Sequence, residues 1–93
     1  MRPKKIIITG GATRIGAAIA ESLANHDTEI SIHYNKSKRA AIKLKNKLEK
    51  LGGQIFLIKA DLNNFKQTQS LLKLANKKMK GVDCLINNAS LFE

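Results

Sequence analysis

The sequence predicts an α/β fold in which a doubly wound parallel sheet is built from the element order β-α-β-α-β-α-β. Short apolar runs rich in β-branched residues alternate with stretches of helical period, and glycines or helix-capping residues separate them. Because the connections are short, each helix should cross over to the next parallel strand, and right-handed crossovers favour the strand order 3-2-1-4. Residues 1–93 are expected to form one domain, since a chain of this length has room for a single sheet with its helices.

The first half of the chain predicts two strands around one helix. A strand is expected over residues 5–9, where three consecutive isoleucines suit a strand that is buried on both faces. A glycine turn follows over residues 10–13, and then an alanine-rich helix over residues 14–25. The second strand is expected over residues 29–34. The side of this helix that should face the sheet carries Ile15, Ala18, Ile19 and Leu23.

The second half predicts two further helices and two strands. Ser37 can cap the second helix, which Gly52-Gly53 ends before a third strand over residues 54–59. Asn63 can cap the third helix, and a fourth strand is expected over residues 82–87. The inward stripes of the two helices should hold Ala41, Leu44, Leu48 and Leu51 in one, and Leu71, Leu72, Ala75 and Met79 in the other.

The strongly basic composition, with a formal net charge of +10, admits a nucleic-acid binder as one interpretation. The lysines, however, are spread along the chain, and aromatic residues make up only 4%, so platforms for base stacking are scarce. A solvated lysine surface explains the charge better, and nucleic-acid binding ranks last among the alternatives. No apolar stretch approaches the roughly 20 residues that a membrane span needs. We therefore expect a cytoplasmic protein with no membrane partner.

The lone cysteine, Cys84, cannot form an internal disulfide, and it lies between apolar neighbours. We expect it to be a small buried hydrophobic residue, because no nearby histidine or cationic setting suggests a reactive thiol. No grouping of residues in the sequence predicts a metal site.

The strongest local signal is the segment Thr9-Gly10-Gly11-Ala12-Thr13-Arg14-Ile15-Gly16, which lies between a buried strand and a helix. Glycines let the backbone approach a pyrophosphate closely, and the helix start offers free N–H groups and the positive end of its dipole. A nucleoside-triphosphate loop is excluded, since Ala17 and Ala18 stand where lysine and serine or threonine would be needed. The segment therefore predicts a dinucleotide-binding turn, with a plain connecting turn as the alternative.

The end of the second strand indicates which dinucleotide is bound. NAD-binding proteins usually place an acid there for the ribose hydroxyls, but His33-Tyr34-Asn35-Lys36-Ser37 contains none. Lys36, the Ser37 hydroxyl and the following helix start would attract a 2′-phosphate, and Arg14 adds a cation from the glycine turn. The sequence therefore predicts NADPH as the cofactor, with a solvated basic loop as the alternative.

Three segments resemble successive motifs of the short-chain dehydrogenase/reductase family. They are Thr9-Gly10-x-x-x-Arg14-Ile15-Gly16, Asp61-Leu62 and Asn87-Asn88-Ala89-Ser90. The resemblance covers the whole chain and implies a partial Rossmann-type domain in which Asp61 contacts the adenine, while Asn88 and Ala89 lie against the cofactor. The full set of residues expected at the cofactor is Gly10, Arg14, Ile15, Gly16, His33, Tyr34, Asn35, Lys36, Ser37, Asp61, Leu62, Asn88, Ala89 and Ser90.

Departures from the general family pattern resemble its pteridine reductase branch. Arg14 replaces the usual second glycine, Ser90 replaces the glycine expected after Asn-Asn-Ala, and His33-Tyr34-x-x-Ser37 follows the second strand. That branch reduces biopterin and folate-type rings with NADPH. The resemblance implies that Ser90 touches both cofactor and pterin, and that Phe92 stacks on the pterin ring.

The family's catalytic Tyr-x-x-x-Lys pair, which belongs to a later helix, cannot be assigned in this chain. Tyr34 and Lys38 have the right spacing, but they fall beside the adenosine ribose, and a general acid must reach the reacting atom. Because the sequence ends at Glu93, we expect a truncated domain that is inactive alone and that takes a pterin- or folate-like substrate only when a C-terminal part completes it. A non-catalytic NADP(H)-binding or regulatory module is the alternative. The free edge of the fourth strand further suggests a homo-oligomer or a complementing chain.

Overall fold

The computed structural model describes residues 4–89, which form a four-stranded parallel sheet with the strand order β3-β2-β1-β4. The strands are β1 (Lys4–Thr9), β2 (Thr28–Tyr34), β3 (Gln54–Lys59) and β4 (Cys84–Asn87). The helices are α1 (Arg14–Leu23), α2 (Lys38–Lys50) and α3 (Phe65–Met79). The predicted α/β fold and strand order are confirmed. Over residues 4–89, no helix combines the length and the apolar character that crossing a membrane requires.

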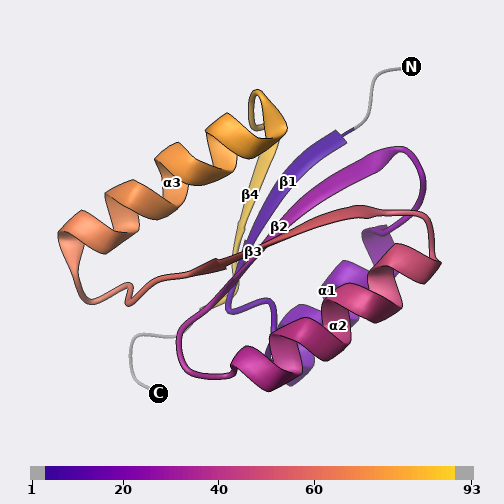
Figure 1. Cartoon of the computed structure of the whole chain (residues 1–93), viewed down its shortest axis with the longest axis horizontal. Helices are drawn as coiled ribbons and strands as arrows, with labels where there is room; N and C mark the ends of the chain where they lie inside the picture. Colours follow the sequence, from indigo (N-terminus) through magenta and orange to yellow (C-terminus); the bar gives the residue numbers. More distant parts are fainter. Residues whose placement is uncertain (1–3, 90–93) are drawn as a thin grey trace.

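The helices cover the two faces of the sheet unequally, with α1 and α2 together on one face and α3 alone on the other (Figure 1). The isoleucine run of β1 serves both faces, because successive side chains of a strand point in opposite directions. Ile6 and Ile8 pack under α1 and α2, whereas Ile7 belongs to the core under α3. All three are buried, as expected for a central strand.

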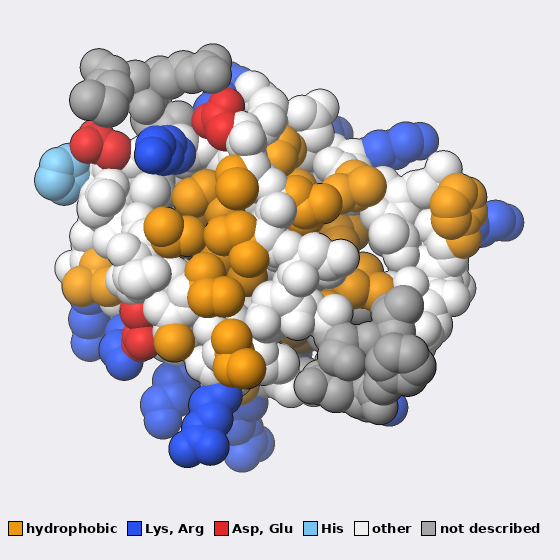
Figure 2. Space-filling model, turned by 180° about the vertical axis from the view of Figure 1, so that it is seen from behind, with side chains coloured by type: hydrophobic (Ala, Val, Ile, Leu, Met, Phe, Trp, Pro, Cys, Tyr) orange, Lys and Arg blue, Asp and Glu red, His pale blue; other side chains and the backbone are white. Residues whose placement is uncertain are grey.

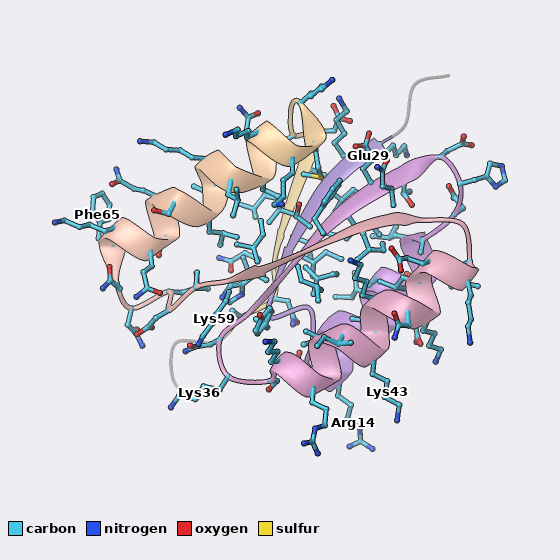
Figure 3. The ribbon with its side chains drawn as sticks, viewed as in Figure 1. Arg14, Glu29, Lys36, Lys43, Lys59 and Phe65 are labelled. Atoms are coloured by element: carbon cyan, nitrogen blue, oxygen red, sulfur yellow. The ribbon has the colours of Figure 1, made fainter. Side chains whose placement is uncertain are left out.

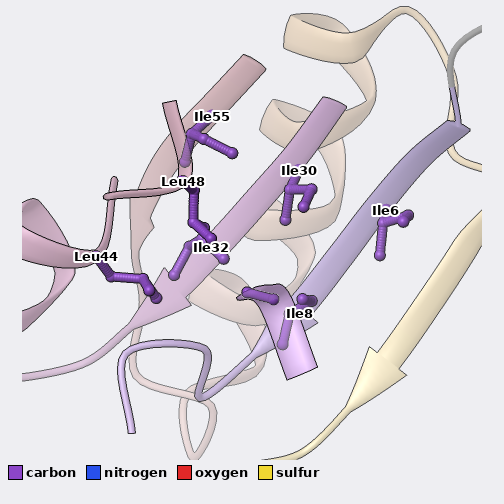
Figure 4. Close-up of a cluster of buried hydrophobic side chains, with 8 residues drawn as sticks. Ile6, Ile8, Ile30, Ile32, Leu44, Leu48 and Ile55 are labelled. Carbon is purple, nitrogen blue, oxygen red and sulfur yellow. The ribbon is translucent and has the colours of Figure 1, made fainter. Parts of the chain in front are cut away.

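The larger core lies between the sheet and the pair α1 and α2 (Figure 4). Leu44 and Leu48 of α2 pack against the β-branched side chains of the strands, and Ala20 of α1 closes the cluster. The strand residues of this cluster are Ile6, Ile8, Ile30, Ile32 and Ile55. Burying each of these side chains contributes about 1.5–3 kcal/mol, so this core fixes both helices over β1 and β2.

The inward face of α1 differs from the prediction. Gly16 and Ala20 are its buried residues, while Ile15 is 68% exposed and Ala18 is exposed. Two small residues one turn apart let α1 lie close to the sheet, and this rotates Ile15 away from it. Ile19 and Leu23 are only partly buried, although they do pack against the core as expected.

The other two helices need smaller corrections. Leu51 follows the end of α2 and is exposed, and Leu72 lies off the buried stripe of α3, which repeats every four residues. Asn64, rather than Asn63, caps α3 by accepting a hydrogen bond from the Gln67 N–H. Ser37 stands at the N-cap position of α2, but its hydroxyl makes no capping bond.

β4 is a short edge strand, and the expectation that Cys84 is buried is wrong. β4 pairs with β1 on one side, and α3 packs over β3 and β2 rather than over β4. Leu85, which shares the α3 face with its register partner Ile7, is therefore 52% exposed, and Cys84 is exposed on the opposite face of the sheet, the face of α1 and α2. Figure 2 looks onto the side of the molecule opposite to Figure 1 and shows hydrophobic side chains gathered there.

A clamp at the amino end of β1 fixes the register of β4. The backbone N–H of Lys5 donates to Asp83 Oδ2 over 3.0 Å, and the Asp83 N–H donates to the Lys5 carbonyl over 2.7 Å. The Lys5 ammonium also donates to the Lys80 carbonyl at the end of α3 over 3.0 Å. Because this clamp aligns β4 with β1, the residues that follow β4 reach the carboxyl end of β1.

Ser31, in the middle of β2, provides a test of the packing under α3. Its register partners are Ile7 and Phe56, it is 0% exposed, and its hydroxyl has no hydrogen-bond partner. Since a buried unpaired hydroxyl costs about 1–3 kcal/mol, Ser31→Ala should raise the free energy of unfolding by about 1 kcal/mol. Urea denaturation followed by circular dichroism measures the change.

Thr28→Ala is the matched control, because the Thr28 hydroxyl is also buried but is hydrogen-bonded to Asn25. This control should lower the free energy of unfolding by about 1 kcal/mol. A comparable loss in Ser31→Ala would show that the Ser31 hydroxyl contributes a stabilising bond.

Candidate functional site

The glycine turn between β1 and α1 lies at the carboxyl edge of the sheet. Gly10 has φ +62°, and a Cβ there would lie 3.1 Å from the Ala89 Cα. A Cβ on Gly16 would lie only 2.3 Å from the Gly10 carbonyl oxygen, because the first turn of α1 packs directly on the loop. Both positions therefore require glycine, one for its backbone conformation and the other for the close approach.

Thr13 and Asn88 hold the carbonyl end of this turn. The Thr13 hydroxyl donates to the Gly10 carbonyl over 2.7 Å and accepts from the Gly16 N–H over 3.3 Å, so it caps α1. The Asn88 amide donates to the Gly10 carbonyl and to the Thr13 hydroxyl, each over 3.1 Å. Asn88 thus supports the loop from beneath. Sequence reasoning missed Thr13, although a threonine three residues before Gly16 is an ordinary N-cap signal.

A second set of bonds ties the end of β4 to the end of β1. The Thr9 hydroxyl donates to Asn87 Oδ1 over 2.8 Å and accepts from the Ala89 N–H over 3.2 Å. These bonds bring Ala89 against Gly10.

His33, near the end of β2, holds the amide end of the glycine turn. The Gly10 N–H donates to His33 Nδ1 over 2.9 Å, and the Gly11 N–H donates to the His33 carbonyl over 3.1 Å. The other ring nitrogen, Nε2, lies 2.8 Å from the Ala60 carbonyl oxygen at the end of β3. Burial lowers the pKa of His33 below its ordinary value of 6.5, and the bond to Ala60 opposes part of that shift.

A pocket of about 380 Å³ opens where these segments meet. Its lining residues are Gly10, Ala12, Thr13, His33, Tyr34, Asn35, Lys36, Ser37, Asp61, Leu62, Asn63 and Ala89. They come from the loops that follow β1, β2, β3 and β4, which is the edge at which open parallel sheets bind ligands. Ala12, Thr13 and Asn63 were not predicted from the sequence.

Four other predicted residues, all within residues 4–89, do not line this pocket. Arg14 and Ile15 are exposed on the first turn of α1, Gly16 packs under the loop, and Asn88 supports it. Ser90 and Phe92 lie outside the described residues. Tyr34, which does line the pocket, and Lys38, which does not, form the pair with catalytic spacing and lie at the end of β2 and at the start of α2.

The electrostatics of this edge favour an anion. All three helices begin here, and no acidic residue occupies the first turn of any of them. α2 begins with Lys38 and Arg39, directly after the pocket residue Lys36. Among the described residues of the pocket lining, the one acid is Asp61, whose Oδ1 accepts the Asn63 N–H over 2.9 Å.

Comparison with known proteins identifies the family. A family model described as short chain dehydrogenase matches residues 4–93. The chain belongs to the short-chain dehydrogenase family. It is 33% identical over 88 residues to the short-chain dehydrogenase/reductase homolog YusS of Bacillus subtilis. The matched region is 95% of this chain and 81% of that relative.

Crystal structures of other short-chain dehydrogenases share the fold. One from Oenococcus oeni is 33% identical with a TM-score of 0.84, over 92% of this chain and 40% of that one. One from Burkholderia cenocepacia, in complex with NADP, is 33% identical with a TM-score of 0.89, over 99% of this chain and 38% of that one. This short-chain dehydrogenase sequence thus spans about two fifths of the length of these structures.

Gly16 provides a test of the loop packing. Gly16→Ala should lower the free energy of unfolding by about 2–3 kcal/mol, because the added methyl meets the Gly10 carbonyl and cannot be accommodated without moving the turn. Gly53→Ala is the control, since a Cβ there would meet chiefly the flexible end of Ile55. Thermal and urea unfolding measure both variants. Equal stability of the two would contradict the close packing of α1 on the turn.

Proposed function

We propose that this chain binds NADPH in the pocket at the carboxyl edge of the sheet, as the cofactor-binding part of a short-chain reductase. The observation that carries the proposal is the pocket lining, in which the Gly10 turn faces the acid-free loop after β2. The volume of about 380 Å³ lies within the usual range of ligand pockets. The NADP-bound relative from Burkholderia cenocepacia, which has the same fold, supports the choice of cofactor.

The corner between β2 and α2 fits a 2′-phosphate. Lys36 lines the pocket, and the Ser37 hydroxyl is not used to cap α2. Lys38 and Arg39 lie in the first turn of α2, where the positive end of the helix dipole repels cations. An anion bound nearby would offset this repulsion. A phosphate at this corner would satisfy the helix N–H groups and offset the repulsion among these cations.

The rest of the cofactor would follow the glycine turn. Gly10, Ala12 and Thr13 would border the pyrophosphate at the start of α1. Arg14 would contribute its charge from the first turn of α1. Asp61 and Leu62 would border the adenine on the opposite side of the pocket.

The reaction that we propose is hydride transfer from NADPH to a pterin- or folate-like ring, as in pteridine reductases. Arg14, the His33-Tyr34-x-x-Ser37 pattern and Ser90 support this branch of the family. Within residues 4–89, Tyr34 and Lys38 have the catalytic spacing, but they lie at the end of β2 and at the start of α2, where this proposal puts the adenosine ribose and not the reacting ring. We therefore propose that this chain supplies cofactor binding and that it catalyses no reduction alone.

Lys36→Ala tests the proposed cofactor and its 2′-phosphate. The wild-type chain should bind NADPH more tightly than NADH in calorimetric titrations. The substitution should weaken NADPH binding about tenfold, since a charge-assisted hydrogen bond is lost, and should leave NADH binding nearly unchanged.

Lys43→Ala is the matched control, because Lys43 is exposed on α2 and extends away from the sheet (Figure 3). It should leave both affinities unchanged. Equal losses for NADPH and NADH in Lys36→Ala would reject the 2′-phosphate contact. The absence of NADPH binding in the wild-type chain would reject the proposed function.

The exposed β4 edge supports a further part of the proposal, association with a second copy or with a complementing chain. Val82 and Leu85 expose apolar surface beside the edge of β4 that pairs with no other strand over residues 4–89. Leu85→Lys should therefore shift light-scattering masses toward the monomer at high protein concentration. A wild-type chain that is monomeric at all concentrations would contradict self-association.

A further inference from the structure

The His33 ring stands at a junction of three strands. Its backbone belongs to β2, Nδ1 accepts the Gly10 N–H after β1, and Nε2 contacts the Ala60 carbonyl after β3. The side chain is 3% exposed although it borders the pocket. Both ring nitrogens are engaged within the protein, so the ring has no nitrogen left to bond a ligand.

These contacts define the protonation state of the ring. A backbone N–H can only donate, so Nδ1 must carry a lone pair toward Gly10. A carbonyl can only accept, so Nε2 must carry the proton toward Ala60. The arrangement therefore requires the neutral ring with its proton on Nε2. A second proton, on Nδ1, would face the Gly10 N–H and break that bond.

Among residues 4–89, the charged groups around the ring provide no bonded counterion for an imidazolium. Asp61 follows β3 in the pocket lining, but its Oδ1 accepts the Asn63 N–H. The cations on the neighbouring elements are Lys36 after β2 and Lys59 at the end of β3, and β1 and its turn bring only Thr9 and Gly10. On the same face of the sheet as His33, the buried residues of α3 are Leu71, Ala75 and Met79.

We propose that His33 is a positioning residue that holds Gly10 in the conformation that binds the cofactor, and that protonation of its ring releases the glycine turn and weakens NADPH binding. The choice of NADPH as the ligand in this inference rests on the proposed function. The loop coupling, by which the protonation of His33 changes the position of the Gly10 turn, rests only on the hydrogen bonds of His33. His33 thus acts on the cofactor through Gly10 and not by direct polar contact.

The pH range follows from the direction of the shift. We call the turn closed when the Gly10 N–H is bonded to His33 and released when that bond is broken. Since burial lowers the pKa of His33 in the closed state, the unfolded chain or the released turn binds the extra proton more readily. The closed turn therefore keeps its full stability above about pH 6.5 and loses stability as the pH falls below that value.

The first experiment follows the ligand-free chain by NMR between about pH 8 and pH 5. The ring-nitrogen shifts of His33 should report the Nε2–H form at the upper end. The Gly10 amide resonance should move with the same midpoint as the His33 ring. His26, which is exposed in the turn before β2, is the internal control, and its ring signals should show no correlation with the Gly10 amide resonance. A Gly10 amide that does not follow His33 would overturn the coupling.

The second experiment measures NADPH affinity over the same pH range in wild type and in His33→Asn. The asparagine carbonyl can accept the Gly10 N–H as Nδ1 does, but it does not titrate. Because phosphate itself titrates at about pH 6, the pH profile of the wild-type affinity is compared with the profile of His33→Asn. Wild-type affinity should fall about tenfold more than that of the variant, as expected for the loss of one buried hydrogen bond. His26→Asn should retain the wild-type profile.

Parallel pH profiles in wild type and His33→Asn would overturn the inference. His33→Leu, which has no acceptor, should bind NADPH weakly at every pH, and restored binding in His33→Asn would show that the acceptor is what matters. If no variant binds NADPH while Gly10 still follows His33, the proposed function fails and the loop coupling stands.

Discussion

The structure of the site depends on the backbone of one residue, Gly10. Its N–H is bonded by the His33 ring, and its carbonyl is bonded by Thr13 and Asn88. Its positive φ turns the chain from β1 into α1, and its missing side chain leaves room for Ala89. Asn88, which is 78 positions away in the sequence, therefore reaches the turn at this residue. A turn that is bonded at both ends presents a preorganised backbone, which lowers the entropic cost of binding a ligand there.

The charge distribution follows from the same topology. In a parallel sheet with right-handed crossovers, every helix begins at the carboxyl edge, so three positive helix ends converge on one side. This chain adds lysine and arginine to those first turns instead of acids. Part of the net charge of +10 is therefore located beside a pocket that helix starts and a glycine turn form. Most lysines of α2 and α3 are exposed on the outward faces of these helices, where Lys47 pairs with Glu21 of α1 and Lys78 lies over the ring of Phe56.

The helices cover the two faces of the sheet to different extents. The cluster under α1 and α2 joins three strands to both helices, whereas α3 packs chiefly over β3, β2 and Ile7 of β1 and leaves Leu85 of β4 52% exposed. The clamp between Lys5 and Asp83 keeps β4 in register despite its exposure. This clamp matters for the site, because Asn88 can reach Gly10 only when β4 is aligned with β1.

The sequence alone determined the order of the elements, their parallel arrangement and the glycine turn. Hydrophobic period, helix-capping residues and the conformational freedom of glycine are local properties, and the crossover rule converts them into the strand order. It also indicated most of the pocket lining, since residues that follow parallel strands share one edge. The tertiary structure decided what depends on contacts between distant segments: the rotation of α1 about Gly16 and Ala20, the exposure of Cys84, and the role of Asn88 beneath the loop. It also decided that both His33 nitrogens bond to the backbone, because no local pattern specifies which carbonyl or N–H a buried ring will meet.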